Sequence, residues 1–492
     1  MKKGNLKVAN QLSMMIVITI VIQIFLLVKN SILAANFGVG VEIDSFNFTT
    51  NLSNFVFSFI GAGISTVVIP YLKDSKDRKS INIFITIVFL IAIILATIII
   101  MFRREVVLLL GGDSSVKFIE ISSNLLFITI GIGLLSSFNT LSTSLLEFNE
   151  FFVRQKIVNL IATVISVTVL LLLTDFTIYV YAILIALIAT INLVFNLIYL
   201  KNTDFKYKIS FNINDETFKN MIFLMGPVLF STGLYQFTVL IDTLIAARLD
   251  TGSISILNYS NTIVAMFNML ILTNLTTYFY PKLVKADSKL ESQNKLSDYL
   301  IIINTLLFFF VTVFFLLGRE GIELLYQRGN FTDKDTQIVF IGALIYMLQL
   351  PVNGTRDLLY KYFYIEKNTK APFVNSIIVS ILNLVISLVL VSVLGLYGVI
   401  LGTVLAGYIS LFTITNKFNK LFGILFSLKI FSREIFKIII SSLVSFIIVY
   451  IMKVNIVLTS PVISIIVYGT FTLVTYAILL KILKSKIFSI KI

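Results

Sequence analysis

Long apolar segments, each about the length of a membrane-spanning helix, follow one another along almost the whole chain. A helix needs about 20 mostly apolar residues to cross the hydrocarbon core of a bilayer. Open strands cannot cross it, because each unpaired backbone group costs several kcal/mol in lipid. The sequence therefore predicts an all-α polytopic membrane protein with fourteen transmembrane helices, near residues 11–36, 44–72, 81–102, 120–146, 152–174, 177–200, 217–249, 253–283, 296–318, 335–364, 371–394, 397–416, 433–452 and 461–481.

The first apolar segment follows a basic end and lacks a small-residue cleavage site. It is also longer than the core of a signal peptide, which has about 7–15 residues. We therefore expect it to be the first retained span.

Two stretches of the chain share one pattern, Lys29–Leu72 and Ile241–Leu283. In each, a polar residue precedes a run of small residues, a glycine follows near the turn, and a mostly apolar run ends in Pro-x-Leu. Repetition at a long period predicts a two-lobed transporter with its site between the lobes.

The repeat sets the predicted domain boundaries. Residues 1–201 form an N-lobe of spans one to six, and residues 217–421 form a C-lobe of spans seven to twelve. An even number of helices per copy gives both copies the same orientation, so a pseudo-twofold axis along the membrane normal relates them. Spans thirteen and fourteen, within 430–492, have no counterpart and are predicted to be appended.

Basic residues predict the orientation in the membrane. With the N-terminus inside, the cytoplasmic segments hold 29 of the 39 lysines and arginines, and the external segments hold eight. Cytoplasmic loops carry an excess of these residues in membrane proteins. We therefore expect both termini to be cytoplasmic. The net charge of +14 is interpreted as contact with anionic lipid and not with nucleic acid.

Composition excludes several kinds of chemistry. The chain is 58% hydrophobic and only 13% charged, and it contains no Cys, His or Trp. Disulfides, thiolate nucleophiles, histidine bases and His/Cys metal sites are therefore excluded. Since no GxxxxGK[ST] phosphate loop is present, the chain cannot hydrolyse ATP by that route.

Charged residues inside the spans are where function is expected, because each costs about 2.5–3.5 kcal/mol at a helix centre on insertion scales. Lys29 lies about 10 Å below the outer end of the first span. It either extends to the external headgroups or lines the cavity between the lobes. Asp242 lies at the same depth in the seventh span, opposite Asn30 in the repeat, and is interpreted as a cation or proton site.

Two further charged positions are open to two interpretations each. Asp44 begins the second span, where it is either an N-cap on the helix dipole or a cavity residue. Arg356 and Asp357 follow Pro351 in the tenth span. Adjacent charges on a helix do not face each other, so at least one should point into the cavity unless other spans neutralise both. Pro227 in the seventh span and Pro351 in the tenth free backbone carbonyls, so each is expected either to kink its helix or to leave carbonyls that coordinate an ion.

The external segment 324–337, LLYQRGNFTDKDTQ, has the most distinctive motif in the chain. Asp333 and Asp335 suit the N-terminus of the next helix. With Phe363-Tyr364 and the run 368–372, this segment resembles the second-lobe signature of the MviN/MurJ-type lipid II flippases, within the multidrug/oligosaccharidyl-lipid/polysaccharide exporter superfamily. The runs 37–70 and 242–259 resemble its lobe-start motifs, so the resemblance covers essentially the whole chain.

The resemblance also implies a substrate site that faces the lipid pyrophosphate. It places Lys29 and Lys361 there, and with Asp44 and Arg356, interpreted above from their places in the spans, these are the predicted substrate-binding residues. The sequence departs from the family where other charged residues are expected, because uncharged residues stand at Gln23, Phe57, Ser58, Asn261 and Thr262. Fewer fixed cations favour a polyprenyl-linked oligosaccharide related to lipid II.

Some family members bind sodium, and the resemblance places that site on Asp242, Asn383, the Val399 carbonyl and Thr403. Ser387 stands where the family has a second carboxylate. The coupling ion stays open between Na⁺ and H⁺, and no cofactor is expected. The alternative for Asn383 and Thr403 is interhelical hydrogen bonding.

The predicted function is that of a monomeric, ion- or potential-driven flippase in a bacterial cytoplasmic membrane. Its partner would be an undecaprenyl-pyrophosphate-linked saccharide, moved outward by alternating access. Three alternatives differ in class. A cation-coupled multidrug exporter should have acidic cavity residues, a polysaccharide polymerase or ligase should carry a large external loop, and a structural division protein would not need repeat-symmetric buried charges.

Overall fold

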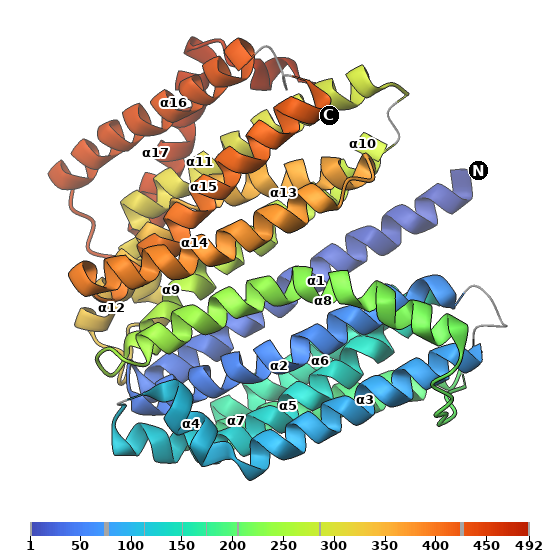
Figure 1. Cartoon of the computed structure of the whole chain (residues 1–492). Helices are drawn as coiled ribbons and strands as arrows, with labels where there is room; N and C mark the ends of the chain where they lie inside the picture. Colours follow the sequence, from blue (N-terminus) through green and yellow to red (C-terminus); the bar gives the residue numbers. More distant parts are fainter. Residues whose placement is uncertain are drawn as a thin grey trace. The chain divides into compact units, whose positions relative to one another are not determined.

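The computed structural model describes residues 2–72, 78–112, 114–149, 151–173, 175–203, 206–284, 287–423 and 428–490, and every regular element in these ranges is a helix (Figure 1). Contacts divide the chain into two units, Met1–Ser255 and Ile256–Ile492. The all-α prediction is confirmed.

The first unit holds the helices from α1 to α8, among which α2 packs against both α5 and α8. They are α1 (Lys2–Phe37), α2 (Val41–Tyr71), α3 (Arg78–Met101), α4 (Arg103–Gly111), α5 (Val116–Phe148), α6 (Phe152–Leu172), α7 (Ile178–Leu200) and α8 (Glu216–Ala246). The short helix α4 was not predicted, since it is too short to form a span.

The second unit continues from α9, which begins at the boundary between the units. The helices are α9 (Ser253–Phe267), the π-helix η2 (Asn268–Thr273), α10 (Asn274–Val284), α11 (Lys289–Tyr326), α12 (Asp333–Met347), α13 (Leu350–Ile365), α14 (Lys370–Leu394), α15 (Leu396–Phe422), α16 (Leu428–Asn455), α17 (Pro461–Ile482) and the 3₁₀ helix η3 (Lys486–Ser489).

Twelve helical segments among the described residues are long and apolar enough to cross a membrane. They coincide with twelve of the fourteen predicted spans. The second and seventh predicted spans coincide with α2 and α8, which include residues whose side chains lie outside the description. Large apolar side chains stay exposed on α3, α7, α14 and α17, as expected of surfaces that face lipid.

The contact-based boundary at Ser255 differs from the predicted boundary in the linker at 202–216. The reason is that α8 packs against α2 and α3 of the first unit. The assignment of α8 to a C-lobe, which rests on the sequence repeat, stays a prediction.

One close contact occurs in both units with the same arrangement. In the first unit, the Ser53 hydroxyl of α2 donates to the Thr129 carbonyl of α5 (2.7 Å), and Gly133 lies one turn further along α5 against Ser53. In the second unit, the Ser260 hydroxyl of α9 donates to the Val339 carbonyl of α12 (3.1 Å), and Gly342 lies against it. Small residues let membrane helices approach closely, and hydroxyls then bond across the interface.

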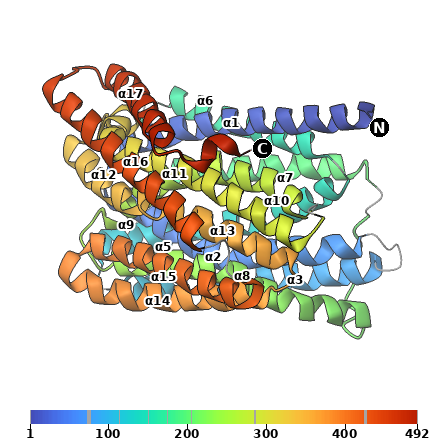
Figure 2. The same cartoon turned by 90° about the horizontal axis from the view of Figure 1, so that it is seen from above.

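The C-terminal helices pack on α11. Tyr476 of α17 donates its hydroxyl to the Thr305 carbonyl (2.9 Å), and the buried side chains of Ile301, Ile438 and Leu480 surround it. In Figure 2, α16 and α17 lie beside α11. The helices predicted as appended are therefore integrated into the second unit through α11.

Caps define several helix ends. Thr332 accepts a hydrogen bond from the Asp335 N–H, and Asp335 accepts one from the Thr332 N–H, so the pair forms a capping box. The predicted place of Asp333 and Asp335 at a helix start is confirmed, and Asp333 also pairs with Arg319 (2.6 Å).

Asp215 joins the linker to two helices. It caps α8 through the Phe218 N–H (2.9 Å) and accepts from the Ser80 hydroxyl of α3 (2.7 Å). The Ser80 hydroxyl and the Phe218 N–H hold the pKa of the Asp215 carboxyl below its usual value. These hydrogen bonds therefore stabilise the attachment of the linker at pH values above the usual pKa of an aspartate. The stabilisation is lost as the pH falls through the lowered pKa of Asp215.

Gly133→Ala should destabilise the protein by about 1–3 kcal/mol, because a methyl group there would press on Ser53 and on the Phe57 ring. Gly131→Ala, on the same helix with open space around it, is the matched control. It should be neutral or stabilising by up to about 1 kcal/mol. Thermal unfolding of the purified variants in detergent measures both, and equal melting temperatures would contradict the close-contact interpretation.

Candidate functional site

The N-terminus of α9 is capped by a carboxylate from α2. Asp44 accepts hydrogen bonds from the backbone N–H groups of Gly252 (2.5 Å) and Ser255 (2.7 Å) and from the Ser255 hydroxyl. Its side chain is buried. A helix start carries unsatisfied donors and partial positive charge, so a buried carboxylate is stabilised there. The structure thus gives Asp44 a capping position, on α9 and not on its own helix.

Gly252 allows the chain to turn at this point. Its φ of +97° favours glycine, and a Cβ atom at this position would collide with the Val39 side chain. The turn between α8 and α9 therefore lies directly against the turn between α1 and α2. These are the two turns that the sequence repeat relates.

Further hydrogen bonds surround this cap. Asn51 donates to the Thr243 hydroxyl (2.9 Å), and the Ser114 hydroxyl donates to the Ala247 carbonyl (2.8 Å). We call Asp44, Asn51, Ser114 and their partners on residues 243–255 the Asp44 junction. The cavity beside it has a volume of about 30 Å³, enough for one or two water molecules but not for a substrate.

Three of the four predicted ion-binding positions lie together in the second unit. The Asn383 side-chain oxygen accepts hydrogen bonds from Thr403 (3.1 Å) and from Ser387 (3.2 Å). The Val399 carbonyl accepts from the same two hydroxyls, at 3.4 and 3.3 Å. We call these four residues the α14–α15 oxygen cluster.

The α14–α15 oxygen cluster suits a hard cation such as Na⁺, because all four of the atoms that could coordinate the ion are oxygens. The interface is tight at this point, since a Cβ on Gly402 would collide with Ser387. Among the described residues, no group of three or more Asp, Glu, His or Cys side chains could hold a metal ion. Asp242, the fourth predicted ligand, is buried in the first unit on α8.

The charged residues of α13 are arranged differently from the prediction. Arg356 Nε lies 3.7 Å from Asp357 Oδ1, so these adjacent residues do face each other, at the long end of the ion-pair range. The expectation that they cannot was wrong, because the long arginine side chain reaches the neighbouring carboxylate although the two side chains leave the helix in different directions. Arg356 Nε is buried and has no hydrogen-bond partner among the described residues.

Both basic residues of α13 lie over aromatic rings. The Arg356 guanidinium is 5.9 Å from the Tyr360 ring, and the Lys361 ammonium is 5.2 Å from the Tyr280 ring of α10. Such contacts hold cations on a membrane helix without cancelling their charge. The remaining predicted substrate residue, Lys29, is half-buried on α1, and no ion pair is formed by it within the described ranges.

Two of the predicted spans are interrupted. The tenth span breaks between α12 and α13, immediately before Pro351, as the proline predicted. Tyr408 donates to the Leu348 carbonyl at this break (3.0 Å). The eighth span contains the π-helix η2, which no proline or glycine signals, and π-helical turns often occur at functional sites.

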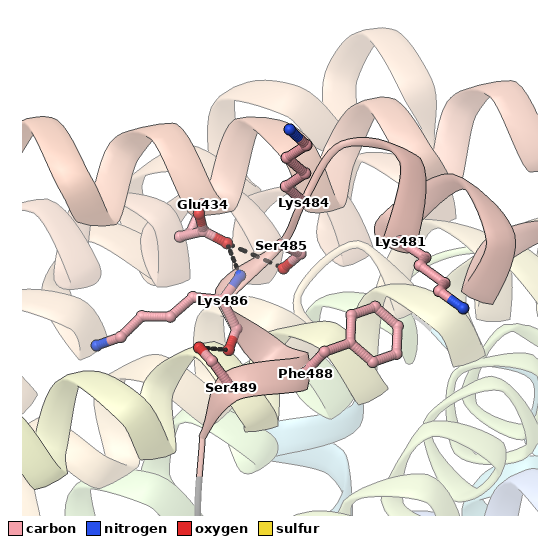
Figure 3. Close-up of a pocket in the computed structure, with 7 residues that line it drawn as sticks. All are labelled: Glu434, Lys481, Lys484, Ser485, Lys486, Phe488 and Ser489. Atoms are coloured by element: carbon pink, nitrogen blue, oxygen red, sulfur yellow. Dashed lines mark hydrogen bonds between the residues drawn. The ribbon is translucent and has the colours of Figure 1, made fainter.

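A pocket of about 570 Å³ lies at the C-terminal end of the chain (Figure 3). Glu434 holds it together by accepting from the Ser485 hydroxyl (2.9 Å) and the Lys486 N–H (2.8 Å). The side chains of Lys481, Lys484 and Lys486 point away from one another in Figure 3. This arrangement anchors the C-terminal segment and does not form a convergent cation site.

Sequence reasoning missed Ser255, Asn51 and Ser114. A weak signal exists for the first, because Asp44 and Ser255 follow the corresponding glycines of the repeat, Gly40 and Gly252, within four residues. No signal in the sequence marks the other two.

Comparison with known proteins gives consistent matches. The family model described as lipid II flippase MurJ matches residues 33–490. The probable lipid II flippase MurJ of Rickettsia prowazekii is 26% identical over 421 residues, which cover 82% of this chain and 83% of that protein. The lipid II flippase MurJ of Thermosipho africanus is 32% identical over 135 residues, covering 27% of this chain and 26% of that protein.

Solved structures with the same fold include two transporters. A lipid II flippase MurJ in an inward closed conformation superposes with a TM-score of 0.81 at 22% identity, covering 95% of this chain and 99% of that one. An inward-facing multidrug resistance MATE family transporter of the MOP superfamily has a TM-score of 0.67 at 12% identity, covering 82% and 95%.

Asp44→Ala should destabilise the protein by about 1–3 kcal/mol, because it leaves the buried N–H groups of Gly252 and Ser255 without an acceptor. Asp44→Asn should cost less, since the amide oxygen still accepts. Glu42→Ala is the control, because it removes a surface ion pair with Lys117 that contributes about 0–1 kcal/mol. Calorimetric melting in detergent measures these changes; equal losses for Asp44→Ala and Glu42→Ala would refute the junction's importance.

Proposed function

Because the chain belongs to the lipid II flippase MurJ family, we propose that it moves an undecaprenyl-pyrophosphate-linked saccharide precursor of the cell envelope from the inner to the outer leaflet of a bacterial cytoplasmic membrane. The family is one of membrane transporters and not of enzymes. The match over residues 33–490 is the observation that carries the proposal. The headgroup is that of lipid II or a related oligosaccharide.

The proposed topology has fourteen spans with both termini in the cytoplasm. Helices α2 and α8, of 31 residues each, supply the two spans beyond the twelve that composition identifies. We propose that residues 1–201 and 217–421 act as two lobes that rock during transport. The serine–glycine contact that recurs at Gly133 and Gly342 supports this two-copy arrangement.

The pyrophosphate is proposed to contact Lys29, Arg356 and Lys361. Arg356 provides the strongest support, because it is a partly buried cation with a distant counterion and a buried, unused Nε donor. A charge inside a membrane-spanning helix is costly, and binding an anion for part of the cycle would offset that cost.

Asp44 is proposed to control access to the external side. In the structure its carboxylate is occupied by the N-terminus of α9. Outward opening would require these hydrogen bonds to break, which would release the carboxylate toward the transport path. A contact between Asp44 and substrate then belongs to the opened state.

An ion gradient or the membrane potential is proposed to drive transport, with Na⁺ or H⁺ as the coupling ion. Each charge that crosses 100 mV contributes about 2.3 kcal/mol. Asp242, Asn383, Val399 and Thr403 are the proposed ligands, with Ser387 beside them. The hydrogen bonds that bring the α14–α15 oxygen cluster together support this assignment.

Arg356→Gln should lower the rate of flipping about tenfold or more in liposomes that contain a fluorescent polyprenyl-pyrophosphate saccharide, because a charge-assisted contact contributes about 1.5–3 kcal/mol. A membrane-impermeant quencher reports the outer-leaflet fraction. Lys334→Gln, which removes an exposed cation on α12, is the control and should keep the wild-type rate. A wild-type rate for Arg356→Gln would remove this residue from the proposed site.

Asp242→Asn should abolish the dependence of that rate on the ion gradient, because it removes the carboxylate among the proposed ligands. An unchanged rate with unchanged ion dependence would refute this role. Depletion of the protein in cells should make one lipid-linked precursor accumulate on the cytoplasmic side, and its headgroup identifies the substrate.

Thr403→Val should reduce stabilisation by sodium, since it keeps the side-chain shape but removes one oxygen from the α14–α15 oxygen cluster. The measurement is the shift in melting temperature between sodium and choline chloride at equal ionic strength. Ser392→Ala, which removes an exposed hydroxyl on α14, is the control. Equal sodium shifts in wild type and Thr403→Val would exclude the cluster as the ion site.

A further inference from the structure

The linker before α8 exposes large apolar side chains beside basic ones. Residues 206–212 have no regular secondary structure, and along 207–213 large apolar residues alternate with polar ones in the sequence. Ile209, Phe211 and Ile213 are 71%, 61% and 62% exposed. Ile209 also lines the pocket described below. Contiguous exposed apolar side chains of this kind indicate a surface that contacts a partner or a membrane.

The linker is attached to the side of a membrane-spanning helix. Tyr207 and Thr86 share a hydrogen bond between their hydroxyls (2.8 Å), and the Ser210 N–H donates to Thr86 (3.3 Å). Thr86 lies eight residues after Arg78, about 12 Å along α3. The linker therefore lies beside the first turns of α3.

The burial of α3 agrees with this position. The residues from Ser80 to Phe89 are almost all buried, whereas large apolar side chains such as Leu90, Ile91 and Ile94 are exposed further along the helix. The part of α3 that the linker contacts is thus buried, and the exposed apolar surface of α3 begins further along the helix.

Between the linker and the start of α3 lies a pocket of about 690 Å³. Four cations line it, two from each side: Arg78, Lys79, Lys206 and Lys208. Lys206 and Lys208 are exposed and form no ion pair within the described ranges. Asp215, which interacts electrostatically with Lys79, is already bonded to Ser80 and Phe218.

Asn82 adds an unused acceptor to this pocket. Its side chain is 8% exposed, and its Oδ1 has no hydrogen-bond partner among the described residues. A buried carbonyl oxygen without a donor costs about 1–3 kcal/mol. A ligand that carries both an anionic group for the lysines and a hydroxyl for Asn82 would satisfy both parts of the pocket.

We propose that this pocket binds the headgroup of an anionic phospholipid, with its phosphate among Arg78, Lys79, Lys206 and Lys208 and its hydroxyl on Asn82, while Phe211 and Ile213, next to the pocket in sequence, insert at the acyl boundary. Phosphatidylglycerol has the required phosphate and hydroxyls. The exposed apolar side chains favour a phospholipid over a free phosphate ion, because only a phospholipid has acyl chains for them to contact. None of its residues is among those proposed for transport, so a bound headgroup would fix the linker that joins the two copies of the repeat.

The absence of tryptophan from the chain gives a direct experiment. Phe211→Trp introduces a single reporter, and the full-length protein is reconstituted in vesicles of phosphatidylcholine with phosphatidylglycerol, one or the other carrying brominated acyl chains. We expect quenching by brominated lipid, and stronger quenching when the phosphatidylglycerol is brominated at equal mole fraction. Phe195→Trp, on the exposed face of α7, is the matched control and should show no preference.

Adding Lys206→Gln and Lys208→Gln should lower the preference for phosphatidylglycerol about fivefold for each lysine removed. Arg104→Gln with Lys334→Gln removes the same charge elsewhere and should leave the preference unchanged. High salt should weaken the preference as well, because screening acts on exposed charges. Circular dichroism and gel filtration verify that each variant is folded.

Three results would overturn the proposal. Quenching of the Phe211→Trp reporter by aqueous iodide and not by brominated lipid would place the linker in water. An equal response to both lipids before and after the lysine substitutions would exclude a headgroup site. Loss of the preference in inorganic phosphate, but not in chloride of the same ionic strength, would show that the pocket takes a free anion.

Discussion

The structure depends on one constraint: backbone N–H and C=O groups inside an apolar surrounding must find partners within the protein. A continuous helix satisfies this constraint with its own backbone hydrogen bonds, but the groups at a helix end or break need partners from elsewhere in the protein. At the start of α9 the donors are taken by Asp44, and at the break before α13 the Leu348 carbonyl is taken by Tyr408. At these two points, polar side chains therefore satisfy backbone groups that the helices leave without partners.

Much of the fold followed from the sequence because period, length and polarity of the apolar segments all point to membrane helices. The proline signal located the break at Pro351, and the acidic residues at 333 and 335 located a helix start. The π-helix η2 could not be predicted, because its residues, Asn268–Thr273, resemble those of any apolar helix. Short α4 was missed because it does not cross the bilayer.

The site was predictable only in part. Asn383 and Ser387 are four residues apart on one helix, so their contact could be predicted once the resemblance had marked both positions. The partner of Asp44 could not, because 211 residues separate it from Ser255 and only the folded chain brings them together. The contact between Arg356 and Asp357 was mispredicted, because the rule for adjacent residues describes where the side chains start and not where a long one ends.

The packing of α16 and α17 on α11 determines what surrounds one face of α11. Without these two helices, the face of α11 around Thr305 and Leu316 would be solvated by annular lipid, whose composition changes with growth conditions. With α16 and α17 in place, that face of α11 contacts protein side chains instead of lipids. The packing of α11 therefore does not change with the lipid composition of the bilayer.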